Sequence, residues 1–192
     1  MDVIKKPIPS QRKATAKAGA FRVKRSDTSV RDLVKATFVI EYKPAQGIEG
    51  FARELRIADV IKVVETERHG VSGRILKDLA IKLALPSGRL FEVLGVPKAT
   101  AEKKIARNEL LKGAGGSAVL GMMKLLNIAQ RIVDKSTAEG APGFNTAKWL
   151  GEWIEQPQPA LGGRKPSEFL DTTTGVEAVS KVLNAVESGA YL

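Results

Sequence analysis

The stretch that decides the fold is residues 145–192, NTAKWLGEWIEQPQPALGGRKPSEFLDTTTGVEAVSKVLNAVESGAYL, which holds both tryptophans of the chain. Asn145 is a suitable N-cap for a helix, and Pro157 cannot continue one, so we expect that helix to end near Gln156. Apolar side chains recur at one-turn spacing between these limits: Trp149, Leu150, Trp153 and Ile154.

Turn-forming residues divide the rest of this stretch. Pro157, Pro159 and the glycines at 162 and 163 predict a rigid turn, and Pro166 suits the first position of a short helix through Asp171. A third helix follows, in which Thr174 and Glu177 have the spacing of a capping box and Gly189 is a natural stop. Its apolar strip is Val176, Val179, Leu183 and Val186.

At these residues the chain resembles the Xre/MbcA/ParS antitoxins, which partner RES-domain toxins. The resemblance covers roughly the last two thirds of the chain and weakens toward residue 55. Several turn-specifying residues fall at fixed intervals, which a generic helical hairpin would not require. The carriers are Trp149-Leu150, Ala160-Leu161-Gly162-Gly163 with Pro166, Phe169-Leu170-Asp171, Thr174-Gly175 with Glu177-Ala178-Val179, and the ending Glu187-Ser188-Gly189-Ala190-Tyr191-Leu192.

The resemblance implies an all-α protein, with an Xre-like helix-turn-helix domain followed by a small helical toxin-binding domain. It also implies that the partner is a RES toxin acting on NAD, so the antitoxin itself needs no cofactor. Whether that toxin hydrolyses NAD, phosphorolyses it or transfers ADP-ribose stays open. The expected toxin-binding residues are Trp149, Trp153, Leu161, Gly163, Arg164, Glu187, Gly189, Ala190, Tyr191 and Leu192.

The chain has 192 residues, of which 43% are hydrophobic, and this composition is typical of an ordinary globular protein. The absence of cysteine fits a reducing cytosol, and no apolar run approaches 18 residues. We therefore expect a cytoplasmic protein without a membrane span or disulfides.

A formal net charge of +10 favours a polyanionic partner, with nucleic acid first, over a basic surface of no specific purpose. Residues 1–25 contain eight basic residues and a single acid, Asp2, which predicts a flexible basic arm. Two roles fit this arm equally well. It is either a functional segment, which contacts phosphates or acts as a regulatory tail, or a leader that only keeps the protein soluble. The apolar cluster at 38–40 fits a short strand or a helix end equally well.

The middle of the chain predicts a helix over 57–68 and then three helices, over 72–83, 87–94 and 99–108, with Gly95-Val96-Pro97 as the tight turn before the last. This order is typical of a helix-turn-helix, in which the last helix reads DNA. The alternative is three ordinary core helices with a solvated basic face. The expected DNA-binding residues are Lys98, Thr100, Lys103, Lys104, Arg107 and Asn108.

Residues 110–117 are glycine-rich, but no strand precedes them and no P-loop lysine-serine pair follows, so we interpret them as a hinge and helix start. The resembled family usually has charged residues here. We expect a connecting helix over 117–134 and a loop over 136–144. The expected organisation is a basic arm over 1–50, a helix-turn-helix domain over 51–112 and a toxin-binding domain over 113–192.

The sequence shows no catalytic constellation, metal-ligand cluster or cofactor motif, and His69, its only histidine, has no supporting residues, so we expect no enzyme. Two functions remain. The first is an antitoxin that blocks a toxin and represses its own operon as a homodimer or a toxin–antitoxin hetero-oligomer. The second is a free-standing basic regulator or nucleoid-type DNA-binding protein. The ending Ala190-Tyr191-Leu192 favours the first, because an aromatic, an aliphatic side chain and a carboxylate could enter a toxin's pocket, although many chain ends are merely frayed.

Overall fold

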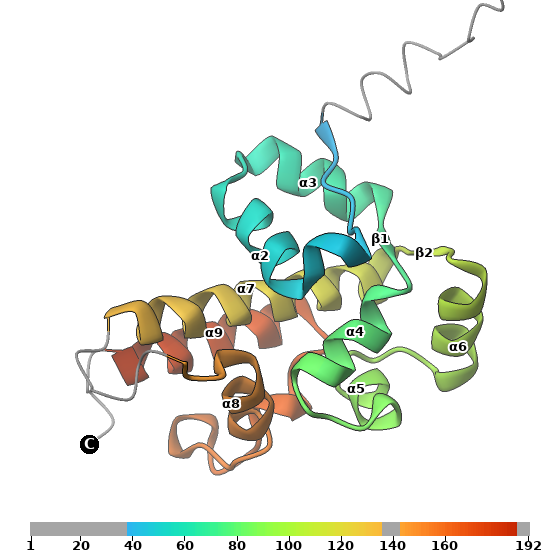
Figure 1. Ribbon diagram of the computed structural model, residues 1–192. Helices are drawn as coiled ribbons and strands as arrows, with labels where there is room; N and C mark the ends of the chain where they lie inside the picture. The colour runs from blue at the N-terminus through green and yellow to red at the C-terminus, as the bar shows by residue number, and fades with distance from the viewer. Residues whose placement is uncertain (1–37, 136–142, 188–192) are drawn as a thin grey trace, which may run out of the picture.

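The computed structural model describes residues 38–135 and 143–187 (Figure 1). Within these ranges the protein is helical apart from a ribbon of two short antiparallel strands, so the all-α prediction is confirmed. The basic arm before residue 38 lies outside the described residues. The elements are η1 (Pro44–Gln46), α2 (Gly47–Ile57), α3 (Val60–His69), β1 (Val71–Ser72), α4 (Ile75–Lys82), α5 (Ser87–Val93), α6 (Lys98–Arg107), β2 (Leu110–Leu111), α7 (Gly113–Lys135), α8 (Thr146–Trp153), η2 (Pro159–Leu161), η3 (Pro166–Glu168) and α9 (Thr173–Glu187).

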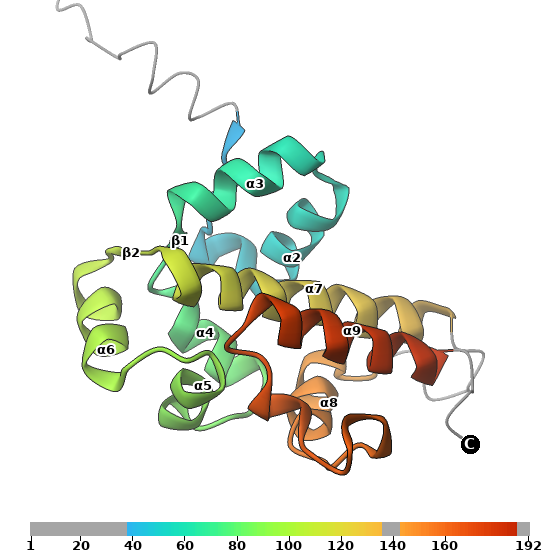
Figure 2. The same cartoon turned by 180° about the vertical axis from the view of Figure 1, so that it is seen from behind.

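Helix α7 is the centre of the molecule. Figures 1 and 2 show α9 running along it, α2 and α3 above it, and α8 below it. Met122, Met123 and Leu125 of α7 are almost fully buried, because other helices pack around most of its circumference. One hydrophobic core joins residues from both halves of the chain. The predicted division at residue 112 therefore does not separate two independent cores.

The core begins before residue 50. Ile40, Tyr42 and Ile48 are buried in it, and the Ile40 amide donates a hydrogen bond of 2.9 Å to the Thr66 hydroxyl of α3. Residues 39–43 have no regular secondary structure, so the apolar run at 38–40 is not a paired strand. These residues correct the predicted arm over 1–50, because apolar side chains near its end are part of the folded protein.

The helix expected from residue 57 begins instead at Val60. Ala58 is extended, and the Asp59 carboxylate accepts a hydrogen bond of 2.8 Å from the Lys62 amide, which caps α3. The chain therefore turns sharply between α2 and α3. Ile57, Val60 and Ile61 at this turn are 76%, 75% and 63% exposed, so these apolar side chains do not face the core.

The connecting helix is longer than expected. It begins at Gly113 and not at residue 117, so the glycines at 115 and 116 form its first turn and not a hinge. The ribbon explains this early start. Val71 pairs with Leu111, and the amide of Gly73 donates a hydrogen bond of 2.9 Å to the Glu109 carbonyl, which fixes the chain just before α7.

Candidate functional site

The first candidate surface is centred on α8. Asn145 caps this helix as expected, because its side-chain oxygen accepts a hydrogen bond of 3.0 Å from the Lys148 amide. Trp149 and Trp153 lie one turn apart, and their rings stack with centroids 6.3 Å apart and an interplanar angle of 26°. Both tryptophans are half-buried and pack against the core, while Leu150 between them is fully buried.

Phe144 extends this pair to three rings. Its ring lies 6.3 Å from that of Trp149 and is 45% exposed. Phe144 precedes the N-cap and Trp149 is the fourth helical residue, so the two form a hydrophobic staple. We call Phe144, Trp149 and Trp153 the aromatic ladder.

A tight turn follows α8. The backbone of Gln158 pairs with that of Arg164, whose carbonyl accepts a hydrogen bond of 3.0 Å from the Gln158 amide. The turn closes through Gly162 and Gly163, whose φ values of 65° and 76° favour glycine. Leu161 packs against the core, whereas Gly163 and Arg164 are exposed.

Arg164 is held in place on this turn. Its guanidinium carbon lies 4.5 Å from the centroid of the Phe169 ring, and its Nε donates to a Glu168 carboxylate oxygen at 3.0 Å. The same carboxylate accepts a hydrogen bond from the Lys165 amide at the start of η3. A fixed cation therefore lies on the same segment as the aromatic ladder.

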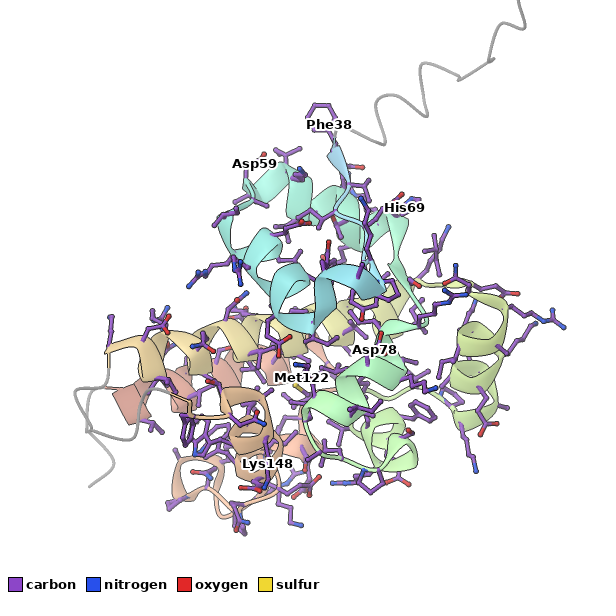
Figure 3. All side chains as sticks on the ribbon, viewed as in Figure 1. Phe38, Asp59, His69, Asp78, Met122 and Lys148 are labelled. Atoms are coloured by element: carbon purple, nitrogen blue, oxygen red, sulfur yellow. The ribbon has the colours of Figure 1, made fainter. Side chains whose placement is uncertain are left out.

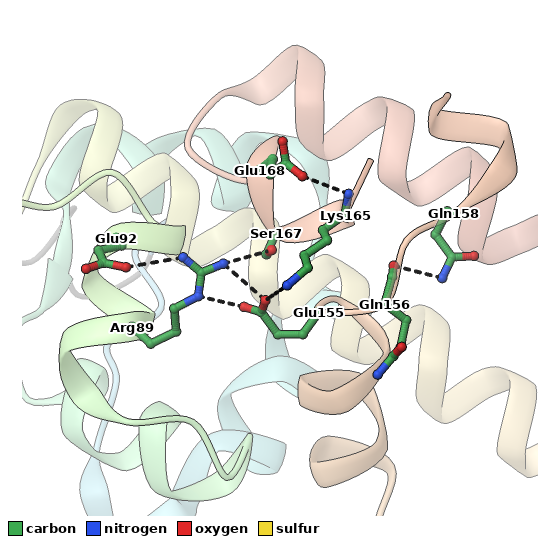
Figure 4. Close-up of polar contacts among 8 residues, drawn as sticks. All are labelled: Arg89, Glu92, Glu155, Gln156, Gln158, Lys165, Ser167 and Glu168. Carbon is green, nitrogen blue, oxygen red and sulfur yellow. Dashed lines mark hydrogen bonds and ion pairs between the residues drawn. The ribbon is translucent and has the colours of Figure 1, made fainter. Parts of the chain in front are cut away.

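An ion network joins this segment to α5 (Figure 4). Arg89 of α5 donates two hydrogen bonds to the Glu155 carboxylate, of 2.8 and 3.1 Å, and a third of 3.1 Å to the Ser167 hydroxyl. Lys165 adds a contact of 3.4 Å to Glu155. Partial burial raises the pKa of Glu155, but the hydrogen bonds and charges of Arg89 and Lys165 outweigh it, so its pKa is lowered.

The second candidate surface consists of α5, a turn and α6. The turn places Gly95 at a positive φ, and the Val96 amide donates a hydrogen bond of 2.8 Å to the Phe91 carbonyl. Ala101 anchors α6 on the core, and the helix ends at Asn108 in a left-handed conformation. Helices α5 and α6 are thus two short helices joined by a tight turn, which is the local geometry that the helix-turn-helix prediction requires.

Ion pairs shape the outer face of α6. Lys104 lies 3.0 Å from the Glu109 carboxylate, and Arg107 lies 3.8 Å from it. The hydrogen bond from Lys104 lowers the pKa of Glu109, with smaller contributions from the charges of Lys104, Lys103 and Arg107. Glu102 also lies 3.9 Å from Lys98, so this basic face contains two acids close to its cations.

Residues 143–189 match the antitoxin Xre/MbcA/ParS C-terminal toxin-binding domain. A Prs ADP-ribosylating antitoxin from Sphingobium sp. (strain YBL2) is 36% identical over 124 residues, which are 65% of this chain and 77% of the relative. This chain belongs to the Xre/MbcA/ParS antitoxin family. The matched segment contains the aromatic ladder, the turn after it and α9.

In this antitoxin, five of the residues expected to bind a toxin gather on one segment: Trp149 and Trp153 on α8, and Leu161, Gly163 and Arg164 on the turn. The Glu187 side chain and residues 189–192 lie outside the part of the chain that the structure describes. Phe144 was not among the expected toxin-binding residues. Its position immediately before the capping Asn145 is the sequence signal of a hydrophobic staple and could have predicted its contact with Trp149.

Of the six residues expected to bind DNA, five are exposed: Lys98, Thr100, Lys103, Arg107 and Asn108. Lys104 is only half-exposed because of its bond to Glu109. The Asn108 side chain accepts a hydrogen bond of 2.9 Å from the Ser72 hydroxyl, so it also holds the ribbon to α6. The sequence did not predict that the Glu109 carboxylate would pair with Lys104 and Arg107 of this set.

The start of α9 corrects one detail of the sequence interpretation. The helix begins at Thr173, and the Thr172 hydroxyl accepts a hydrogen bond of 3.1 Å from the Gly175 amide. Thr172 is thus the capping residue, and Thr174 is inside the helix. Adjacent threonines offer equivalent caps in the sequence, so packing of the preceding turn decides between them.

Within residues 38–135 and 143–187, no group of three or more His, Cys, Asp or Glu side chains could hold a metal ion. No helix within these ranges is long and apolar enough to cross a membrane.

Proposed function

We propose that this antitoxin neutralises an NAD-consuming RES-domain toxin by binding it through the aromatic ladder and the adjacent turn, with its C-terminal residues at the toxin's active site. The observation that carries this proposal is the partly exposed row of three neighbouring aromatic rings inside the segment that matches the toxin-binding domain. The protein then acts as an inhibitor and not as an enzyme.

The chemistry of the surface supports a protein partner. Large aromatic side chains that are already held in one conformation lose little entropy on binding, and they often supply most of an interface's binding energy. Arg164 is similarly fixed between Phe169 and Glu168, so its charge is pre-oriented. Such an arrangement suits a concave, partly acidic partner.

The composition of the C-terminal tail, residues 189–192, is the reason for placing it at the toxin's active site. Tyr191 supplies an amphipathic ring and Leu192 an aliphatic side chain, a pair that suits a concave apolar pocket. The relative's name joins ADP-ribosylation to an antitoxin, and ADP-ribosyl transfer consumes NAD, which is the chemistry proposed for the toxin here.

Toxin binding is tested with Phe144→Ala, measured by calorimetry with the cognate toxin. Phe38→Ala is the matched control, because Phe38 is 43% exposed and lies on another part of the molecule. We expect the dissociation constant to rise at least about tenfold for Phe144→Ala and to stay unchanged for the control. Equal affinities for both variants would remove the ladder from the interface.

We also propose that the antitoxin binds operator DNA through α6 and represses its own operon. The support is the geometry of α5 and α6 together with a net charge of +10. Residues 51–112 then act as the DNA-binding domain and residues 113–192 as the toxin-binding domain, with α7 shared structurally between them. A free-standing regulator is the alternative function, and failure to bind a toxin while binding DNA would favour it.

A further inference from the structure

A cavity adjoins the aromatic ladder and reaches α2, which belongs to the other half of the chain. It encloses about 530 Å³. Phe144 of the ladder and Thr146 of α8 line it from the C-terminal half, and Arg53, Arg56 and Lys82 line it from the N-terminal half. The matched toxin-binding domain therefore meets α2 and the end of α4 at this cavity.

Positive charge dominates the lining of this cavity. Glu49 is the single acid among its lining residues, and its carboxylate lies 2.7 Å from the Lys82 ammonium. Arg53 and Arg56 are exposed and lie one turn apart on α2. Neither has an ion-pair partner among the residues that the structure describes. The fold thus leaves two guanidinium groups here without a counter-charge.

The core holds these cations in a fixed position relative to the ladder. Ala52, next to Arg53, is buried, and its carbonyl accepts a hydrogen bond of 2.7 Å from the Asn127 side chain of α7. Phe144 is held at the other end by its contact with Trp149. Since α7 packs against both α2 and α8, the backbone that carries these side chains is ordered before any partner binds.

We propose that an acidic segment of the toxin enters this cavity, so that the toxin interface continues from the aromatic ladder onto α2. This inference rests on the proposed toxin binding and names the chemistry of one part of the partner. Carboxylates of the segment pair with Arg53 and Arg56, and an apolar side chain between them packs on Phe144. Because α2 lies outside the matched domain, the contact adds selectivity for a toxin that has such a segment.

Operator DNA is the other polyanion that these two cations could attract. Its phosphates lie along a wide convex surface, which a row of exposed cations matches better than a cavity does. Arg53 and Arg56 instead line a cavity next to a ring that is 45% exposed, Phe144. A cation pair beside an apolar ring suits a short acidic segment of a protein.

The test measures binding of the full chain to the cognate toxin by surface plasmon resonance at several salt concentrations. The variant combines Arg53→Gln with Arg56→Gln, which removes both charges and keeps two exposed helix-forming residues. We expect its dissociation constant to rise about tenfold, mainly through slower association, and to depend less on salt than that of the unmodified antitoxin.

The matched control combines Arg74→Gln with Lys77→Gln. These two residues are also exposed and three positions apart, they have no ion-pair partner among the described residues, and they do not line the cavity. Figure 3 shows Asp78, which follows Lys77, on the opposite side of Met122 from Lys148 of α8. The control removes the same charge, so we expect it to bind the toxin as the unmodified protein does.

The outcomes separate this inference from the proposed function. Toxin binding that is unchanged in the Arg53→Gln, Arg56→Gln variant would overturn the inference alone, and so would equal weakening in the control. Unchanged toxin binding with weaker binding to operator DNA would assign the two cations to DNA. An unmodified antitoxin that does not bind the toxin would overturn the proposed function and this inference together.

Discussion

At the scale of single residues, Gly151 determines how closely α8 approaches α4. A Cβ atom built on Gly151 would lie 2.0 Å from the Leu83 carbonyl oxygen, which is backbone and cannot rotate away. We predict that Gly151→Ala lowers the free energy of unfolding by about 2–3 kcal/mol, because the helices must separate. Gly88→Ala is the control, since nothing lies within 4 Å of its added carbon, and denaturant unfolding should show it to be as stable as the unmodified protein or slightly more so.

Glu155 links stability to pH. Its pKa is lowered in the folded protein, mainly by Arg89 acting against partial burial, so its ionised form stabilises the fold. That contribution is fully present above the ordinary pKa of 4.5 and is lost as the pH falls through the lower folded value. We predict that Glu155→Gln costs about 1–2 kcal/mol at neutral pH and that thermal unfolding shows this difference shrinking below about pH 4.5. A difference that is constant down to strongly acidic pH would show that packing and not charge is responsible.

At the scale of elements, Glu109 limits the positive charge that α6 presents. We predict that Glu109→Gln raises affinity for operator DNA and steepens its salt dependence, by up to about 0.9 in the slope for each cation released to a phosphate. Lys104 and Arg107 are those cations. Glu152→Gln, which makes the same charge change beside Lys148 on α8, should leave both quantities unchanged in fluorescence anisotropy titrations. No response to Glu109→Gln would place α6 away from the DNA.

The helices, caps and turns were more predictable from the sequence than the tertiary contacts and exposure of their side chains. The cap at Asn145, the inward residues of α4 and α5 and the turn at Gly95 follow local rules of spacing and capping. The exposure of Ile57, Val60 and Ile61 could not be predicted, because their helical spacing shows that they share one face but not whether that face meets core or water. The bond between Lys104 and Glu109 and the contact of Gly151 with Leu83 arise only from tertiary packing.

At the scale of the whole molecule, α7 and the Arg89–Glu155 network connect the proposed DNA-binding and toxin-binding surfaces in one core. We predict that deleting residues 189–192 leaves a folded protein that still binds DNA, because the described core and α6 do not include them. Circular dichroism and anisotropy would check this prediction. Loss of folding on truncation would give the tail a structural role.

The most direct test of the central claim measures NAD consumption by the cognate toxin while antitoxin is titrated in. We predict that the full chain abolishes consumption at a stoichiometric ratio, that Phe144→Ala shifts the inhibition curve to higher concentration, and that the chain without residues 189–192 binds but inhibits poorly. Full inhibition by both variants would contradict the account, because neither the aromatic ladder nor the tail would then be needed to neutralise the toxin.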